Sequence, residues 1–177
     1  MAAARAPLWA AMAALAILAS AALPARAQSA SLPVDAEIST TLLSVDNPQN
    51  LRFGAQVPGT PMTINARASA NAGALLIHGN RNAEIALSWT LPAALVIGPY
   101  VMPVAFGPTS GCWRDKTGQS GCTLYDPRAP LIQRIRNVPS PNNTFYVWLG
   151  GTVSPTPTQH PGMYAAPVTL AVVYTGN

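Results

Sequence analysis

The sequence predicts an all-β protein, an immunoglobulin-like sandwich of two sheets with about seven to eight antiparallel strands. Several short segments alternate apolar and polar residues with a period of two, which is typical of half-buried strands. Sixteen of the 18 prolines lie after residue 27, where they break helices and separate short strands. Such segments with turn residues between them favour a sandwich over a helical or α/β fold.

The clearest strand signal covers residues 84–91. Ile85, Leu87 and Trp89 fall on one face of this segment, and small or polar residues fall on the other. Residues 144–149 are apolar on both faces, as expected near the centre of a sandwich. Further strands are expected at residues 38–45, 51–54, 62–64, 74–78, 100–106 and 164–174. Turns are expected at residues 46–48 and 57–59, and Pro103 predicts an edge strand or a bulge.

Residues 1–27 have the layout of a secretory signal peptide. Arg5 supplies a positive charge, residues 8–23 are apolar, and Ala25-Arg26-Ala27 fits the small-x-small cleavage rule. An apolar stretch of about 16 residues is shorter than the roughly 20 needed to span a bilayer. We expect cleavage after Ala27, one domain over residues 28–177, no stable membrane insertion after cleavage, and export to the periplasm, cell surface or exterior.

Residues 107–141 break the alternating pattern and predict an elaborated loop with a strand at 131–136. The two cysteines, Cys112 and Cys122, lie in this loop, and in an exported protein they predict one disulfide. Exposed aromatic side chains beside charges can bind a sugar ring or a protein partner. The candidate ligand contacts are therefore Trp113, Arg114, Lys116 and Tyr125. The alternative interpretation is that Trp113 packs beneath the loop against the edge of the core.

The distribution of charged and catalytic residue types argues against several classes of function. After residue 27 the chain has eight Lys or Arg and six Asp or Glu, scattered along the sequence, whereas nucleic-acid binding needs clustered positive charge. His78 and His160 are the only histidines, and no metal-ligand spacing or nucleophile elbow is present. We expect no enzyme activity, no cofactor, no metal and no nucleic-acid partner.

Two segments are candidates for assembly by strand exchange. An extended segment can add to the exposed edge of a sheet, with main-chain hydrogen bonds for affinity and alternate side chains for specificity. Apolar residues occur at every second position in both segments: Leu32, Val34, Ala36 and Ile38 in the first, and Tyr164, Ala166, Val168, Leu170, Val172 and Tyr174 in the second. The first segment is also interpretable as the first strand of its own sandwich.

Three sequence blocks carry a resemblance to a known family. They are Leu51-Arg52-Phe53-Gly54 with Val57-Pro58-Gly59, residues 144–153, and Pro161-Gly162-Met163-Tyr164 leading into residues 168–174. In this order they resemble the blocks of the DUF4402 family of secreted bacterial proteins, which is similar to spore-coat-U-type pilus subunits. Trp148, Pro167 and the Cys112–Cys122 loop depart from the pattern.

This resemblance implies a pilin-like β-sandwich without catalytic residues. We expect an exported structural protein, a subunit or accessory component of a fimbria-like surface fibre assembled by strand donation. Its partners would be copies of itself or other fibre subunits, and a periplasmic chaperone. The alternative is a monomeric adhesin or ligand-binding module that uses the Cys112–Cys122 loop.

Overall fold

The computed structural model describes residues 42–135 and 144–176 of the 177-residue chain. These residues form twelve strands and no helix, and every strand pair is antiparallel. The prediction of an all-β fold is confirmed. The described part of the chain has no helix that is long and apolar enough to cross a membrane. The expected signal peptide at residues 1–27 lies outside the described residues.

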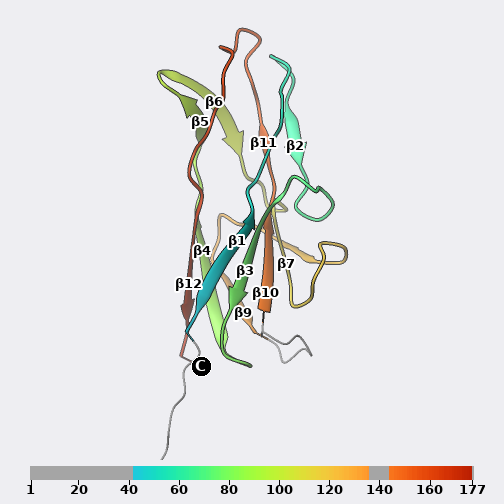
Figure 1. Cartoon of the computed structure of the whole chain (residues 1–177), viewed down its shortest axis with the longest axis vertical. Coiled ribbons are helices and arrows are strands. Elements are labelled where there is room, and N and C mark those ends of the chain that lie inside the picture. Colours follow the sequence, from blue (N-terminus) through green and yellow to red (C-terminus); the bar gives the residue numbers. More distant parts are fainter. Residues whose placement is uncertain (1–41, 136–143, 177) are drawn as a thin grey trace, which may run out of the picture. The chain divides into compact units, whose positions relative to one another are not determined.

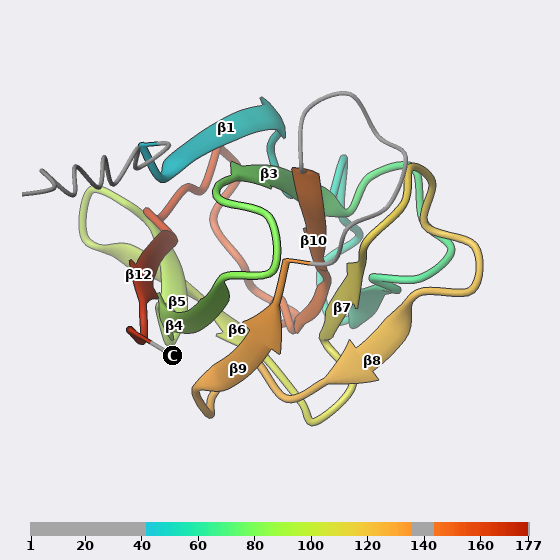
Figure 2. The ribbon, with the colours of Figure 1, turned by 90° about the horizontal axis from the view of Figure 1, so that it is seen from below.

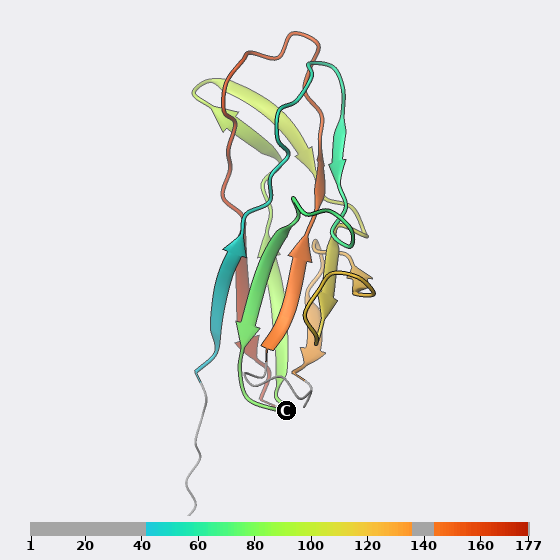
Figure 3. The same ribbon diagram turned by 45° about the vertical axis from the view of Figure 1, so that its right-hand side comes forward.

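The largest sheet has five strands, and the central ones stand side by side in Figure 3. In spatial order they are β1 (Ser44–Gln49), β3 (Gly73–His78), β10 (Thr144–Leu149), β7 (Gly111–Arg114) and β8 (Thr123–Tyr125). β10 is the middle strand of this sheet. Its residues are apolar on both faces, and most of them are buried. Phe145, Val147 and Leu149 lie on one face, while Trp148 pairs with Ala74 and lies on the other.

A three-stranded sheet faces the inner side of the five-stranded sheet, as Figure 2 shows from below. Its order is β12 (Thr169–Tyr174), β4 (Glu84–Thr90) and β9 (Leu131–Arg134). Ile85 and Leu87 of β4 are fully buried against Ile77 and Phe145 of the opposite sheet. The alternation predicted for residues 84–91 therefore gives β4 a core face. We call the buried cluster between these two sheets the first core; its members are Ile77, Ile85, Leu87, Ile135, Phe145 and Val147.

A third sheet continues the structure beyond the end of β10 (Figure 1). Its order is β2 (Met62–Ile64), β11 (Gly151–Val153), β6 (Tyr100–Ala105) and β5 (Ala94–Ile97). Met102, Val104 and Phe106 pack with Leu149 and Val153 into a separate cluster, which we call the second core. Trp89 packs against both cores.

The strands are more numerous and arranged differently from the two sheets of seven to eight strands that the sequence predicts. Gly150 divides one extended run into β10 and β11, because at this point the chain leaves one sheet and enters another. The expected elaborated loop at residues 107–141 contains β9, where a strand at 131–136 was predicted, and also β7 and β8, which were not predicted. β7 and β8 are only four and three residues long, too short to show a period.

Prolines explain two further differences, at residues 46–48 and 164–174. The expected turn at Asp46-Asn47-Pro48 lies inside β1, where the pairing with β3 shifts register between Asp46 and Gln49 and an edge position tolerates Pro48. The expected strand at residues 164–174 begins only at Thr169, because Pro167 lacks the N–H that a ladder needs. Residues 51–54 belong to no strand.

Pro103 marks neither an edge strand nor a bulge, since β6 lies between β11 and β5. β11 pairs only with Val104 and Ala105, so Pro103 lies just beyond that pairing and loses no ladder bond there. Its carbonyl still accepts a hydrogen bond from the Ser154 N–H over 3.0 Å.

Candidate functional site

An apolar groove of about 1430 Å³ lies beside the second core. One wall is the chain from Asn47 to Pro58, and the other is the chain from Gln159 to Val168. The floor is made by side chains from several strands, which are Leu75, Trp89, Leu95, Met102, Val104 and Leu149. Apolar side chains of the second core therefore form part of the surface of the groove.

Both walls run mostly outside the strands. Residues 50–61 form no strand, and the opposite wall joins a sheet only at the single bridge between Ala165 and Val96. Leu51 and Phe53 nevertheless pack against the second core, so this wall presents alternating side chains to the groove. Extended segments with few ladder bonds at the mouth of an apolar groove are the setting in which a further strand can be added.

Side-chain contacts hold the second wall in place. The Tyr164 hydroxyl donates to the carbonyl of His160 over 2.8 Å, and Gln159 Nε2 donates to that hydroxyl over 2.7 Å. Gln159 also donates to the carbonyl of Val101 in β6 over 3.0 Å. The His160 ring stacks on Tyr100 with the ring centroids 3.9 Å apart. The wall is thus tied to the β5–β6 hairpin.

The predicted assembly residues divide into three groups. Tyr164, Ala166 and Val168 line the groove. Leu170, Val172 and Tyr174 lie in β12 and pack against the first core. The third group lies outside the described residues and comprises Leu32, Val34, Ala36 and Ile38.

The predicted disulfide is confirmed. Cys112 and Cys122 are bonded, with their Cα atoms 5.7 Å apart, and both are buried. They cluster with Trp148 and Ala66 on the outer face of the five-stranded sheet. Arg67 Nη2 donates to the carbonyl of Cys122 over 2.7 Å, which ties the loop to the chain that follows β2.

The four candidate ligand contacts are not brought together on one surface. Trp113 stacks on Phe145 with the centroids 5.2 Å apart and packs against the first core, as the alternative interpretation had it. Tyr125 packs against the same core. Arg114 donates to the carbonyls of Gly118 and Ser120 within its own loop, and Lys116 is exposed.

The two histidines and the ion pair between Arg128 and Asp126 occupy separate places. His78 Nε2 lies 3.1 Å from Asp46 Oδ2 and links β3 to β1, whereas His160 lies at the groove wall.

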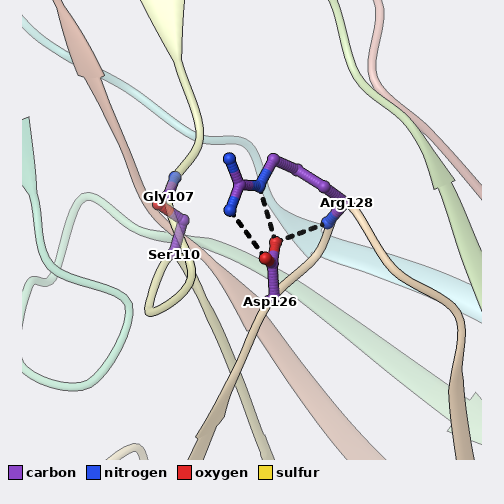
Figure 4. A network of polar contacts seen from close by, with 4 residues as sticks. All are labelled: Gly107, Ser110, Asp126 and Arg128. Atoms are coloured by element: carbon purple, nitrogen blue, oxygen red, sulfur yellow. Dashed lines mark hydrogen bonds and ion pairs between the residues drawn. The ribbon is translucent and has the colours of Figure 1, made fainter.

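Arg128 holds both carboxylate oxygens of Asp126 close to the Gly107–Ser110 turn, as Figure 4 shows. Hydrogen bonds from Arg128 lower the pKa of Asp126 from its ordinary 3.8 to about 2. Within residues 42–135 and 144–176, no group of three or more His, Cys, Asp or Glu is arranged to hold a metal ion.

Sequence reasoning missed the part played by Leu51, Arg52 and Phe53. These residues were identified as part of a family-like block and as a strand, not as the wall of a groove. The available signal was the apolar pair flanking one charged residue, between two turns. The groove itself depends on how distant segments pack, which the local pattern does not contain.

No protein-family model, no curated protein sequence and no solved structure matches this chain, so the family resemblance stays a prediction.

Proposed function

We propose that this protein is an exported structural protein, a subunit or accessory component of a fimbria-like surface fibre assembled by strand donation. The observation that supports the proposal is the apolar groove of about 1430 Å³ whose walls lie mostly outside the strands. The donated segment would be Leu32–Ile38 of a second copy, whose apolar residues recur at every second position. Alternate side chains of an extended strand point to one face, so these residues would enter the groove together.

The exposed surface fits a protein that works by association. Only 9% of the residues are charged, which gives weak protection against self-association. Large apolar side chains lie exposed around the groove and the β5–β6 hairpin, including Met163 at 87%, Val57 at 67% and Val101 at 57%. Contiguous exposed apolar surface marks interaction sites on soluble proteins.

The test is the oligomeric state of the purified full chain, measured by analytical ultracentrifugation over a range of concentrations. A variant with Leu32→Ser, Val34→Ser and Ile38→Ser removes the apolar side chains that would enter the groove. The matched control changes three neighbouring polar residues, Ser29→Ala, Ser31→Ala and Ser39→Ala. We expect the parent and the control to assemble and the triple-serine variant to remain monomeric with an unchanged melting temperature.

The acceptor side has its own variant. Ala166 lies half-buried in the groove wall, and Ala166→Phe would narrow the groove without removing a contact of the core. We expect this variant to donate its own segment normally but to accept none. If the parent is a monomer at all concentrations, or if the triple-serine variant assembles like the parent, strand donation is wrong and a self-contained binding module becomes the better hypothesis.

A further inference from the structure

One charged side chain stands at the rim of the groove. Leu51 and Phe53 pack against the second core, and Arg52 between them is exposed because successive side chains of an extended chain point to opposite sides. Among the groove-lining residues within 42–135 and 144–176, Arg52 is the only Lys, Arg, Asp or Glu. Its backbone N–H donates to the carbonyl of Asn71 over 3.0 Å, which fixes its place at the rim.

The guanidinium of Arg52 has no partner among the described residues, whereas Arg67, Arg114 and Arg128 each hold at least one acceptor. It borders a smaller polar hollow of about 350 Å³ that adjoins the groove. This hollow is lined largely by side-chain amides: Asn47, Gln49, Asn50 and Asn71. Gln49 Nε2 already donates to the carbonyls of Ala70 and Ala72, and Asn47 Nδ2 donates to Asn50 Oδ1. The Arg52 guanidinium therefore supplies the positive charge and the main donors of the hollow, which suit a carboxylate.

The segment proposed to enter the groove carries the complementary charge. Asp35 and Glu37 alternate with the apolar residues of Leu32–Ile38, and the segment contains no Lys or Arg. In an extended strand these two carboxylates share one side, and the apolar side chains share the other. When the apolar side faces the groove, the carboxylates face outward, on the side where Arg52 lies.

We propose that Arg52 of one copy pairs with a carboxylate of Asp35 or Glu37 of a second copy and thereby restricts strand donation to the registers in which one of these two carboxylates reaches Arg52. This inference rests on the proposed function and adds a register-restricting residue to it. A slip of one residue would turn the apolar side chains out of the groove. A slip of two residues preserves the apolar alternation and can exchange one carboxylate for the other, whereas a further slip brings Pro33 or Ser39 to Arg52 and loses the charge pair.

The donor is assigned to a second copy because of the residues that separate it from β1. Residues 39–43 read Ser-Thr-Thr-Leu-Leu and contain no Gly, Pro, Asn or Asp. Gly, Pro, Asn and Asp are the residues that tight turns favour most, and Ser39 is the single residue of this segment whose type is common in turns, so the sequence gives little support for a turn that would fold the segment back along its own chain. Donation within one chain is one of the outcomes that the experiment distinguishes.

The experiment uses two full-length variants with exchanged charges. The first is Arg52→Glu, and the second carries Asp35→Arg and Glu37→Arg. In each variant alone, donor and acceptor carry like charges, so we expect the concentration for half-maximal assembly to rise about tenfold or more. In a 1:1 mixture every donor meets an opposite charge on the other variant, and assembly should return to the parental concentration. The control is Lys116→Glu, an exposed charge reversal in the disulfide loop, which should assemble like the parent.

Each failure has a different meaning. If Arg52→Glu assembles like the parent while the triple-serine variant does not, the charge pairing is wrong and the proposed function stands. One chain can also carry Arg52→Glu, Asp35→Arg and Glu37→Arg together. If this chain returns to the parental assembly concentration but the 1:1 mixture does not, the segment pairs within its own chain and the assignment to a second copy is wrong. If the triple-serine variant assembles normally, the proposed function fails before the charge pairing is in question.

Discussion

The indole Nε1 of Trp89 donates a hydrogen bond to the phenol oxygen of Tyr125 over 2.8 Å. Trp89 belongs to β4 and Tyr125 to β8, so the bond joins strands of two different sheets. The Tyr125 ring also lies over Gly111, where an added Cβ would come within 2.6 Å of it. Tyr125 is therefore a structural side chain at the edge of the first core, although it lies just outside the disulfide loop in sequence.

Removing the Tyr125 hydroxyl should destabilise the fold. Tyr125→Phe keeps the ring but leaves the Trp89 N–H without its acceptor, which costs about 1–3 kcal/mol for a buried donor. The free energy of unfolding, measured by chemical denaturation, should fall by that amount. The matched control is Tyr100→Phe, at an exposed ring, where a change within about 0.5 kcal/mol is expected. Equal losses in the two variants would contradict a specific role for the bond.

Alkaline pH should weaken the fold through the same residue. Burial raises the pKa of Tyr125 above its ordinary value of 10, and the hydrogen bond from Trp89 offsets this only in part. Above pH 10 the unfolded chain loses the Tyr125 proton while the folded chain keeps it, so the free energy of unfolding falls as pH rises. Unfolding measured between pH 9 and about 11 should show this slope. The slope should be smaller in Tyr125→Phe, and an identical slope there would assign it to other groups.

Removing the disulfide should destabilise the protein without changing its fold. The Cys112–Cys122 bond closes a loop with a sequence separation of 10, for which the chain-entropy model gives about 3 kcal/mol. A variant with Cys112→Ala and Cys122→Ala should lose about 2–3 kcal/mol in denaturant unfolding. Dithiothreitol should lower the stability of the parent and leave this variant unchanged. A parent insensitive to reduction would contradict the prediction.

A side chain at Gly150 should be poorly tolerated. An added Cβ would overlap the carbonyl oxygen of Ile64 and approach the Ala66 nitrogen to 2.8 Å, and both are backbone atoms that cannot rotate away. Gly150→Ala should therefore cost about 3 kcal/mol, the upper end of overpacking. The control is Gly107→Ala, where the nearest atom is Ser110 Oγ at 4.0 Å and stability should change little. Similar melting temperatures for both variants would show that β2 moves aside freely.

The sequence predicted well the strands whose pattern is long enough to show a period, and it also predicted the short β2 at its observed residues 62–64, after the expected turn at 57–59. β4 and β10 were placed within about one residue of their observed ends, because each has six or seven residues with clear burial. β7 and β8 were missed, since they are short and take their places from pairing with β10 and with each other. β12 was predicted too long because the apolar alternation continues through Pro167, where the hydrogen-bonded ladder cannot.

The groove was beyond the reach of local pattern. Its walls lie mostly outside the strands, and its floor comes from β3, β4, β5, β6 and β10, so it exists only through tertiary packing. The same limit applies to Trp113, whose sequence neighbours are charged while its ring stacks on Phe145. The Cys112–Cys122 bond was predictable because the chain has two cysteines, so a single pairing is possible.

The ten residues from Thr144 to Val153 have a consequence for how the molecule comes apart. They run through the middle of the five-stranded sheet as β10 and then, past Gly150, pair on both sides as β11. Phe145 and Val147 are buried in the first core, and Leu149 and Val153 in the second. Neither core can melt without pulling this shared segment from the other, so amide hydrogens in both should exchange through one common opening event.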